Sequence, residues 1–585
     1  MLRKFTTPRR LRQWVCKCSS AHDEPVLPCL WRRSVWCRLA PVWGAVLSVT
    51  ALLLMWGPSL PYRVGEIPAR DLRTRVPFEE INHALTERYR EEAIERLTDP
   101  RERETVYLTV PSVVEHYPPG IPLARRGQPI TERQLSLLAK EHQAYCQTLT
   151  PQDRWRRSGA LFLVNSLLAA LIVLYVVRFQ TSLAESLPKI TAVCVLIFLT
   201  MLLILALSRS PWHAHFIPLM VTAMILTIAY NPQFALLMSI SLTLMTTMAL
   251  GTDMHQLLIM MGGMASAVLL LRNVRTRSRL VQVAVGAGLA SMAMTVAAGL
   301  LSGQTGHLIA LDAGRHFVWA LLAGFIVSGS LPLIERAFGI VTDISLLELA
   351  DGRHPLMQEL IRRAPGTYTH SITVGTLAEA AAEAIDANPL LARVGSYFHD
   401  IGKMLKPHYF IENQTGINRH DDLEPALSTL VIIGHVKDGI ALAKQYRLPK
   451  PIVDCIQEHH GTTLVEYFYR EAVKQQQQLG NTSCDLEPTF RYPGPKPQSP
   501  ETAIIMMADC VESSSRALSV PNPNSLRKLV HDMLMKRLLD GQFEESGLTL
   551  TQLHQIEDSL CKGLIALYHA RIKYPAEEST TRKAG

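Results

Sequence analysis

Residues 397–403 read Tyr-Phe-His-Asp-Ile-Gly-Lys, and this stretch decides the fold of the C-terminal part of the chain. His399 and Asp400 stand side by side at the predicted end of a buried helix, Gly402 supplies a turn, and Lys403 adds a mobile positive charge. A neutral imidazole and a carboxylate at adjacent positions can ligate one metal ion or share two. Because His-Asp dipeptides are common, the pair alone is a weak signal.

Further candidate ligands flank this stretch on both sides. They are His370, His435, His459, His460 and Asp509. Each falls within or next to an apolar helical run, where an unpaired polar group is costly. Any one histidine alone is more often a core or surface residue than a ligand, and this is our interpretation of His354 and His408. The joint pattern over one domain's length predicts a metal site.

A two-metal site needs ligands from several helices and one bridging group. Asp400 is the natural bridge, because a carboxylate offers two oxygens and a histidine one free nitrogen. The predicted ligands of one ion are His370, His399, Asp400 and Asp509. Those of the other are Asp400, His435, His459 and His460. This mixed set favours two Mn or Fe ions and does not exclude zinc.

Two such ions would give the site the chemistry of a hydrolase. Divalent ions about 3.5–4 Å apart lower the pKa of a water between them and hold both oxygens of an in-line phosphoryl displacement. The predicted catalytic residues are His399, Asp400 and Lys403. The candidate substrate-binding residues are Lys403, Lys437, Asn413 and His420. A solvated surface charge is the alternative for either lysine, and a helix cap is the alternative for His420.

The composition indicates a membrane protein. The chain has 585 residues, of which 48% are hydrophobic and only 19% charged, below the roughly 25% that is usual in globular proteins. The net charge of +8 is concentrated in a basic N-terminus, which we interpret as a topology signal rather than a nucleic-acid footprint. The ten cysteines form no disulfide pattern, which favours reduced cytoplasmic thiols.

Shifts of composition divide the chain into six parts. They are a basic leader (1–38), a transmembrane anchor (39–60), a shortened extracytoplasmic domain (61–157), a seven-helix transmembrane region (158–336), a cytoplasmic domain (337–575) and a tail (576–585). The seven apolar segments lie near 160–178, 189–208, 213–230, 232–250, 256–272, 280–302 and 316–334. Each approaches the ~20 residues that cross a bilayer as a helix. The two segments that meet at Asn231-Pro232 are alternatively one helix with a break.

The positive-inside rule gives the orientation. With the N-terminus inside, the loop that carries Arg272, Arg275, Arg277 and Arg279 is also inside, and the last membrane helix ends on the cytoplasmic face. Arg154, Arg156 and Arg157 are a contrary detail, because they would lie outside. The membrane segments carry almost no ionisable residue, which disfavours a transporter or a channel.

The remaining segments are expected to be helical. The extracytoplasmic domain is predicted to be α-rich, with an amphipathic helix at 78–97, a turn-like stretch at 115–122 and a helix capped by Thr131. In the cytoplasmic domain, amphipathic runs at 371–386, 389–400, 424–446, 449–459 and 501–518 predict an all-α fold. Gln475–Gln478 is assigned to a polar loop. The predicted fold class is an all-α cytoplasmic domain that follows a multi-helix transmembrane bundle.

The ligand set resembles the HD superfamily of metal-dependent phosphohydrolases. Five stretches narrow the resemblance to the seven-transmembrane HD family: 364–371 (APGTYTHS), 410–414 (FIENQ), 435–439 (HVKDG), 459–462 (HHGT) and 490–497 (FRYPGPKP). Those proteins are bacterial membrane phosphodiesterases that hydrolyse cyclic di-AMP to linear pApA. The resemblance is strong over about 340–575. In the extracytoplasmic domain it reaches only the two ends, and the Gly-Tyr-Pro signature of the cyclic di-GMP branch is absent.

The resemblance implies a two-metal phosphodiesterase of the bacterial inner membrane, a multi-pass protein whose HD domain faces the cytoplasm. Its expected partners are a cyclic dinucleotide and the lipid bilayer, with no nucleic-acid polymer and with a homodimer left open. One alternative is an HD phosphohydrolase that acts on another nucleotide. Another is a membrane receptor that binds a cyclic dinucleotide without cleaving it, although the complete ligand set disfavours this. Ligands fix the reaction type, whereas pocket shape fixes the substrate.

Overall fold

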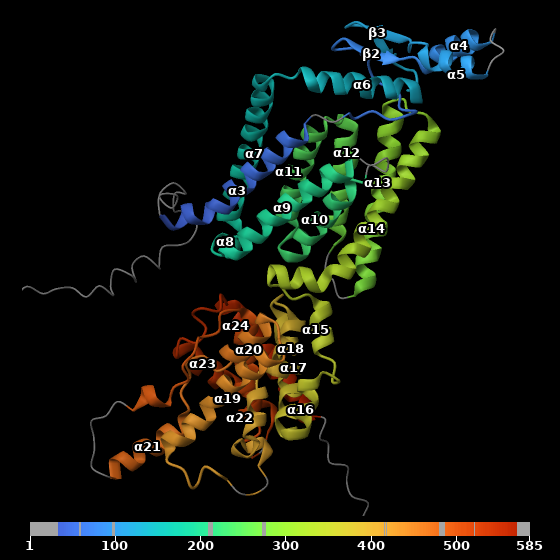
Figure 1. Ribbon diagram of the computed structural model, residues 1–585. Coiled ribbons are helices and arrows are strands. Elements are labelled where there is room, and N and C mark those ends of the chain that lie inside the picture. Colours follow the sequence, from blue (N-terminus) through green and yellow to red (C-terminus); the bar gives the residue numbers. More distant parts are fainter. Residues whose placement is uncertain are drawn as a thin grey trace, which may run out of the picture. The chain divides into compact units, whose positions relative to one another are not determined.

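The computed structural model describes residues 33–57, 60–95, 100–208, 214–271, 276–414, 416, 418–478, 486–519 and 521–569. The predicted leader up to residue 32, Arg272 and Arg275 of the basic loop, and the predicted tail lie outside these residues. The chain forms two compact units, residues 1–272 with 280–331 and residues 273–279 with 332–585. Both are mainly helical, as Figure 1 shows, and the predicted fold class is confirmed.

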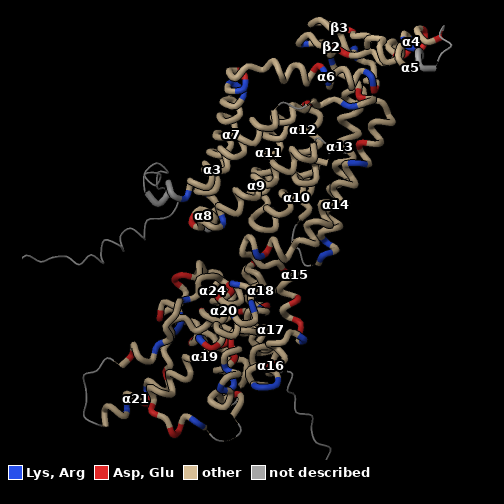
Figure 2. The backbone as a smooth tube through the Cα atoms, in the orientation of Figure 1, with Lys and Arg blue, Asp and Glu red and all other residues tan. Residues whose placement is uncertain are grey.

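Apolar helices dominate the first unit. They are α3 (Arg33–Trp56), α7 (Pro151–Phe179), α9 (Leu187–Ser208), α10 (Phe216–Ala229), α11 (Pro232–Leu250), α12 (Met254–Leu270), α13 (Arg277–Leu301) and α14 (Gly306–Phe338). Figure 2 shows α10, α11 and α12 without charged residues. The anchor helix α3 starts and ends earlier than the predicted 39–60. The seven segments predicted after it correspond to the seven helices from α7 and α9 through α14.

A helix break separates α10 from α11. The Asn231 side chain accepts a hydrogen bond from the Phe234 backbone N–H at 2.8 Å, and Pro232 occupies the first turn of α11. Proline has no N–H to donate and suits the first turn of a helix, so the chain ends one helix and starts another here. The two helices pack against each other, so they are not one kinked span.

Length and hydropathy alone would also make α19 (Pro425–Gln445) a membrane span, one of seven such helices in the described part of the chain. Helix α19 belongs to the second unit, where Leu442 and Ala443 lie in its hydrophobic core beside Ile452 and Ile456. Its apolar residues therefore serve a domain core. Conversely, α10 and α12 are shorter apolar helices, and α10 is buried along most of its length.

Helix α14 begins at Gly306, well before the predicted start at 316. It consequently includes Asp312 and Arg315, two charged residues that the sequence analysis placed outside the membrane segments. Arg63 forms a bidentate ion pair with Asp312, with nitrogen–oxygen distances of 2.7 and 2.8 Å. The Gln304 side chain accepts from the Ile67 backbone N–H at 2.8 Å and donates to the Ile67 carbonyl at 3.0 Å. These bonds connect the segment between α3 and α7 to α14 and to the turn that precedes it.

The segment between α3 and α7 contains both helices and strands. It comprises β1 (Leu72–Arg73), β2 (Phe78–Ile81), α4 (His83–Ile94), α5 (Pro100–Thr109), β3 (Val114–Tyr117), β4 (Pro122–Ala124) and α6 (Glu132–Thr148). Antiparallel pairs form between β1 and β4 and between β2 and β3. The predictions of a helix from residue 78 and of turns at 115–122 are therefore wrong at these strands. The Phe78 ring stacks on Tyr117 with the ring centroids 4.9 Å apart. Local periodicity in the sequence does not predict such a contact between two strands.

The second unit is a helical domain. It contains α15 (Asp343–Leu349), α16 (Pro355–Arg363), α17 (Pro365–Ala384), α18 (Pro389–Phe398), η1 (Ile401–Leu405), η2 (Pro407–Tyr409), η3 (Ile411–Asn413), α19, α20 (Lys450–Glu458), α21 (Glu466–Gln478), η4 (Glu487–Phe490), α22 (Pro500–Ser515), α23 (Pro523–Leu539) and α24 (Leu550–His569). The amphipathic runs of the sequence analysis match α17–α20 and α22. Gln475–Gln478 ends helix α21 and is not a loop.

We expect Asp312→Asn to loosen the segment between α3 and α7. The substitution removes the charge from a bidentate, mostly buried ion pair, and such charge-assisted bonds contribute about 1.5–3 kcal/mol. Hydrogen exchange at the Ile67 amide of the full chain in detergent should therefore accelerate more than tenfold. Asp71→Asn is the control, because Asp71 pairs with Arg73 in an exposed bridge of 3.4 Å. Equal exchange rates in the two variants would contradict this assignment.

Candidate metal centre

Five helices of the second unit bring the predicted ligands together. His370 lies on α17, His435 on α19 and Asp509 on α22. Two pairs of ligands occupy the first residues after a helix, and these are His399-Asp400 after α18 and His459-His460 after α20. Helix ends can direct two consecutive side chains into one site, which the middle of a helix cannot do because successive residues there point 100° apart.

Asp400 lies between two groups of potential ligands. Its Oδ2 atom is 3.1 Å from His399 Nε2 and 3.5 Å from His370 Nε2. Its Oδ1 atom is 3.3 Å from His435 Nε2 and 3.6 Å from His459 Nε2. One oxygen therefore faces each group, which is the arrangement that a bridging carboxylate requires.

The two groups coincide with the two predicted ligand sets. One contains His370, His399, Asp400 and Asp509, and the other Asp400, His435, His459 and His460. Within each group the potential ligand atoms lie within 4.8 Å of one another. Asp509 also approaches the second set, since its Oδ2 is 3.9 Å from His460 Nδ1. The geometry therefore offers two adjacent places for a cation.

Backbone carbonyls orient three of the imidazoles. The Nδ1 atoms of His399, His435 and His459 lie 2.6, 2.5 and 2.9 Å from the carbonyl oxygens of Ser396, Ile432 and Ile456, each three residues earlier. Because Nδ1 must donate in these bonds, the lone pair of each neutral ring is on Nε2, which faces Asp400. Hydrogen bonds of this kind fix the tautomer and the ring orientation of metal-binding histidines.

Several buried polar atoms of the site have no hydrogen bond among the described residues. They are Nε2 of His370, Nε2 of His399 and Oδ1 of Asp400, and the side chains that carry them are at most 3% exposed. Burial of an unpaired polar group costs free energy. His370 Nδ1 lies 2.6 Å from Glu512, so a neutral His370 directs only a lone pair toward Asp509, 3.1 Å away. A cation bound here would accept the lone pair of His370 and would also pair with the Asp509 carboxylate. The residues therefore fit a metal centre.

The ionisation states suit cation binding. Burial opposes ionisation of Asp400 and Asp509, but their histidine neighbours, together with Lys403 for Asp400, outweigh it and hold both pKa values well below the ordinary range. Burial lowers the pKa of His435 to about 3, which leaves its ring neutral. His370 differs, since burial lowers its pKa but the neighbouring Asp509 and Glu512 carboxylates favour the protonated ring and raise the pKa to about 9. Its proton would be released when a cation binds.

Two family models match the chain. The model described as 7TM receptor with intracellular HD hydrolase matches residues 155–342, and the HD domain model matches residues 367–514. The cyclic-di-AMP phosphodiesterase PgpH of Bacillus subtilis is 36% identical over 437 residues, which cover 72% of this chain and 60% of that protein. PgpH of Listeria monocytogenes is 34% identical over 504 residues, which cover 83% of this chain and 67% of that protein. The chain belongs to this family of seven-transmembrane HD proteins.

The family assignment confirms the resemblance found in the sequence and makes the chain a multi-pass membrane protein. The HD domain is a metal-dependent hydrolase domain, and the cluster around Asp400 is where this chain can bind metal. The chain spans 60% and 67% of the lengths of the two curated relatives. The crystal structure of the L. monocytogenes PgpH HD domain in complex with cyclic-di-AMP is 44% identical, covers 38% of this chain and all of that one, and has a TM-score of 0.35.

Lys403 is less mobile than the sequence suggested. Its ammonium is 2.6 Å from Asp400 Oδ2 and 3.1 Å from Glu412 Oε1, with 13% of the side chain exposed. Burial disfavours the charged form, but Asp400 and Glu412 outweigh it and raise the pKa of Lys403. Lys403 is thus a fixed positive charge beside the bridging carboxylate.

The other candidate substrate residues occupy different environments. Asn413 accepts hydrogen bonds from the backbone N–H groups of Gly366 and Thr367 and donates to Thr367 Oγ1, so its amide braces the start of α17. His420 lies 2.9 Å from the Tyr409 carbonyl oxygen through Nε2. Lys437 is exposed on α19. Contacts of all three with a substrate stay predictions. His408 is exposed, and His354 caps α16.

Three residues near the ligands were missed at the sequence level. Glu512 holds His370, Glu412 pairs with Lys403, and Tyr492 stacks on His460 with centroids 4.3 Å apart. Glu512 lies three residues after Asp509 on the same helix, and this spacing places both on one face. That spacing could have revealed Glu512. Glu412 and Tyr492 lie in stretches that carried the family resemblance.

Gly402 allows η1 to approach α19 closely. A Cβ atom at this position would lie 1.9 Å from the His435 carbonyl oxygen and 2.6 Å from the Gly439 nitrogen. Both contacts are with backbone, which cannot move aside as a flexible side chain can. The glycine is therefore needed for close packing between two segments that carry ligands, in addition to the turn inferred from the sequence.

We expect Gly402→Ala to lower the free energy of unfolding by about 1–3 kcal/mol, because the added methyl group overpacks a backbone contact. Gly434→Ala is the matched control, since an added Cβ there meets nothing within 4 Å and alanine favours a helix. The thermal midpoint of the detergent-solubilised protein should fall for the first variant and stay or rise for the second. Similar midpoints would refute the packing role.

We expect Glu512→Gln to weaken metal binding about 10- to 100-fold, because partners that orient a ligating histidine have effects of this size. Glu501→Gln, on the same helix and away from the ligands, should have little effect, since its contact is a hydrogen bond from the Asn388 backbone. Calorimetric titration of the metal-free protein with Mn²⁺ measures both affinities. An unchanged affinity in Glu512→Gln would exclude its role in positioning His370.

Proposed function

We propose that this protein is a membrane-bound phosphodiesterase that hydrolyses cyclic di-AMP to linear pApA at a two-metal HD site. The observation that carries the proposal is the position of Asp400, with one carboxylate oxygen toward each of two histidine groups. The two PgpH relatives are cyclic-di-AMP phosphodiesterases by name. Their similarity supports the substrate, which the ligands alone do not specify.

In the proposed site, the seven predicted ligands hold two divalent ions, Mn or Fe in preference to zinc. They are His370, His399, Asp400, His435, His459, His460 and Asp509. When bound, the ions activate water for attack on phosphorus and stabilise the charge on the oxygens of the phosphoryl group. Four of the five imidazole rings, those of His370, His399, His435 and His459, are held in place by hydrogen bonds to Glu512 or to backbone carbonyls.

The residues around the ligands define how substrate would enter. The His460 side chain is 22% exposed and Asp509 11%, whereas Asp400 and His459 are nearly inaccessible. A phosphodiester would therefore approach from the side of His460 and Asp509. Lys403 compensates the negative charge of Asp400 and Glu412. The ribose 3′ oxygen leaves as the new P–O bond to water forms, which yields the linear product.

The proposed topology places the HD domain on the cytoplasmic side of a bacterial inner membrane. The apolar helices of the first unit support a bilayer location, and the positive-inside rule supports the orientation. A bilayer and a cyclic dinucleotide are the proposed partners, a nucleic-acid polymer is not, and a homodimer stays a prediction. The domain boundaries at 38, 60, 157, 336 and 575 likewise stay predictions.

The test uses the full chain in detergent, loaded with Mn²⁺ and incubated separately with cyclic di-AMP, cyclic di-GMP and an alarmone. We expect conversion of cyclic di-AMP to pApA, and a loss of at least about 10³-fold in Asp400→Ala, because this change removes a ligand shared by both ions. Gly434→Ala is the control variant, which should show that substitution and purification alone do not abolish activity. Cleavage of another nucleotide instead would support the hydrolytic chemistry but refute cyclic di-AMP as the substrate. Binding without cleavage would favour a receptor, and full activity in Asp400→Ala would refute the two-metal site.

A further inference from the structure

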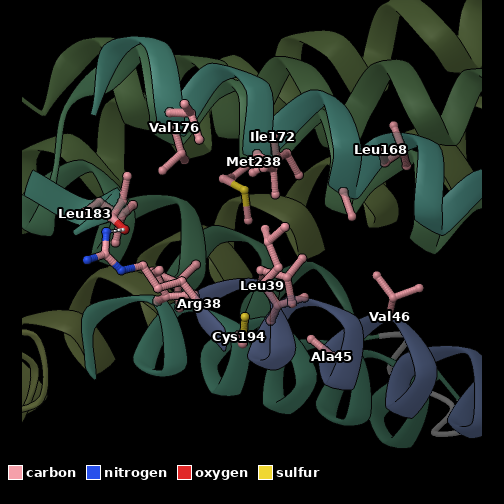
Figure 3. Close-up of a pocket in the computed structure, with 18 of the residues that line it drawn as sticks. Arg38, Leu39, Ala45, Val46, Leu168, Ile172, Val176, Leu183, Cys194 and Met238 are labelled. Atoms are coloured by element: carbon pink, nitrogen blue, oxygen red, sulfur yellow. Dashed lines mark hydrogen bonds between the residues drawn. The ribbon is translucent and has the colours of Figure 1, made fainter. Parts of the chain in front are cut away.

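A cavity of about 320 Å³ lies among the apolar helices of the first unit, far in the sequence from the HD site. Side chains of α3, α7, α9 and α11 and of the short helix α8 (Thr181–Ala184) line it. Figure 3 shows Leu39, Ile172 and Met238 around this space and Arg38 beside Leu183. The volume lies at the lower end of the range of about 300–1,000 Å³ that is usual for small-molecule sites.

The lining is apolar along most of its length. On α7, Leu168, Ile172 and Val176 recur every four residues and form one stripe toward the cavity. Opposite them are Val42, Val46 and other residues of α3 and α9. Such walls suit a hydrocarbon chain.

Three of the helices around the cavity, α3, α7 and α9, are those that the protein covers least. In the most apolar window of α7 only 11% of the residues are buried within the protein, and in α3 and α9 the values are 22% and 28%, against 61% in α11. Leu163 and Leu167 of α7 are 71% and 61% exposed. Because this is a membrane protein, the surroundings of these helices are lipid, and acyl chains are the molecules present at high concentration beside the cavity.

One end of the cavity is polar and basic. Arg38 lines it, and its guanidinium donates a weak hydrogen bond to the Ala184 carbonyl at 3.5 Å. The adjacent segment 178–189 adds Arg178 and Lys189, and its sequence holds a single acid, Glu185, which also lines the cavity. Three cations against one carboxylate give this end a positive charge.

We propose that this cavity is a binding site for an anionic phospholipid, with an acyl chain between α3, α7 and α9 and the phosphate at Arg38. Arginine suits the role because its planar guanidinium presents several donors to phosphate oxygens. Small residues, Ala45 and Ala169 among them, leave the space that the chain occupies. The site would join the N-terminal anchor helix α3 to the bundle through the lipid.

The test measures lipids retained by the full-length protein from mixed micelles that contain equal phosphatidylglycerol and phosphatidylcholine of the same acyl chains. Native mass spectrometry counts both. We expect wild-type protein to retain phosphatidylglycerol preferentially, and Arg38→Gln to reduce this preference about fivefold, since one basic residue near anionic lipid contributes about 1 kcal/mol. Arg38→Lys should restore most of it. Arg125→Gln is the control, because Arg125 is exposed and lies outside the segments around the cavity.

A second pair of variants tests the cavity itself. Ala169→Phe fills it, whereas Ala170→Phe places the same ring on the exposed side of α7. We expect the first to lose the retained phospholipid and the second to keep it. Equal retention in the two variants would overturn the site, and an unchanged lipid preference in Arg38→Gln would overturn the role of the headgroup. If Ala169→Phe does not fold, the Arg38 comparison still decides.

Discussion

The HD domain depends on one buried carboxylate. Asp400 is 1% exposed and has four histidine nitrogens within 3.6 Å. A group in this position is tolerated only when positive charge compensates it, and Lys403 and the proposed cations supply that charge. Several helices must meet at this point, so the requirement for compensation also determines how the domain packs. The close backbone approach at Gly402 and the hydrogen bond that His370 donates to Glu512 serve the same end.

The membrane-associated unit follows a different constraint. In a bilayer, backbone groups must be satisfied within each segment, so helices are the available structure. Specific polar contacts then become few and informative. The ion pair between Arg63 and Asp312 is one, and the basic end of the cavity at Arg38 is another. Both lie where the apolar helices end or meet another part of the unit.

The errors in the sequence analysis share a cause. The periodicity of residues 78–97 predicts one amphipathic helix, but Phe78–Ile81 form strand β2, whose partner β3 lies more than thirty residues later. Helix α14 begins ten residues before the predicted span, and its Asp312 is neutralised there by Arg63 from the segment before α7. In each case a segment distant in the sequence supplies the partner, strand β3 for β2 and Arg63 for Asp312, and no local pattern contains that information.

The sequence by itself determined the order of the apolar helices, the all-α character of the HD domain and the seven residues that cluster around Asp400. Apolar length, helical periodicity and the chemistry of His and Asp are properties of short stretches, so they can be read locally. Only the tertiary structure decided that each oxygen of Asp400 faces a different group, that Lys403 is fixed and that Glu512 orients His370. These facts depend on distances between segments up to 142 positions apart in the chain, which packing sets and spacing in the sequence does not.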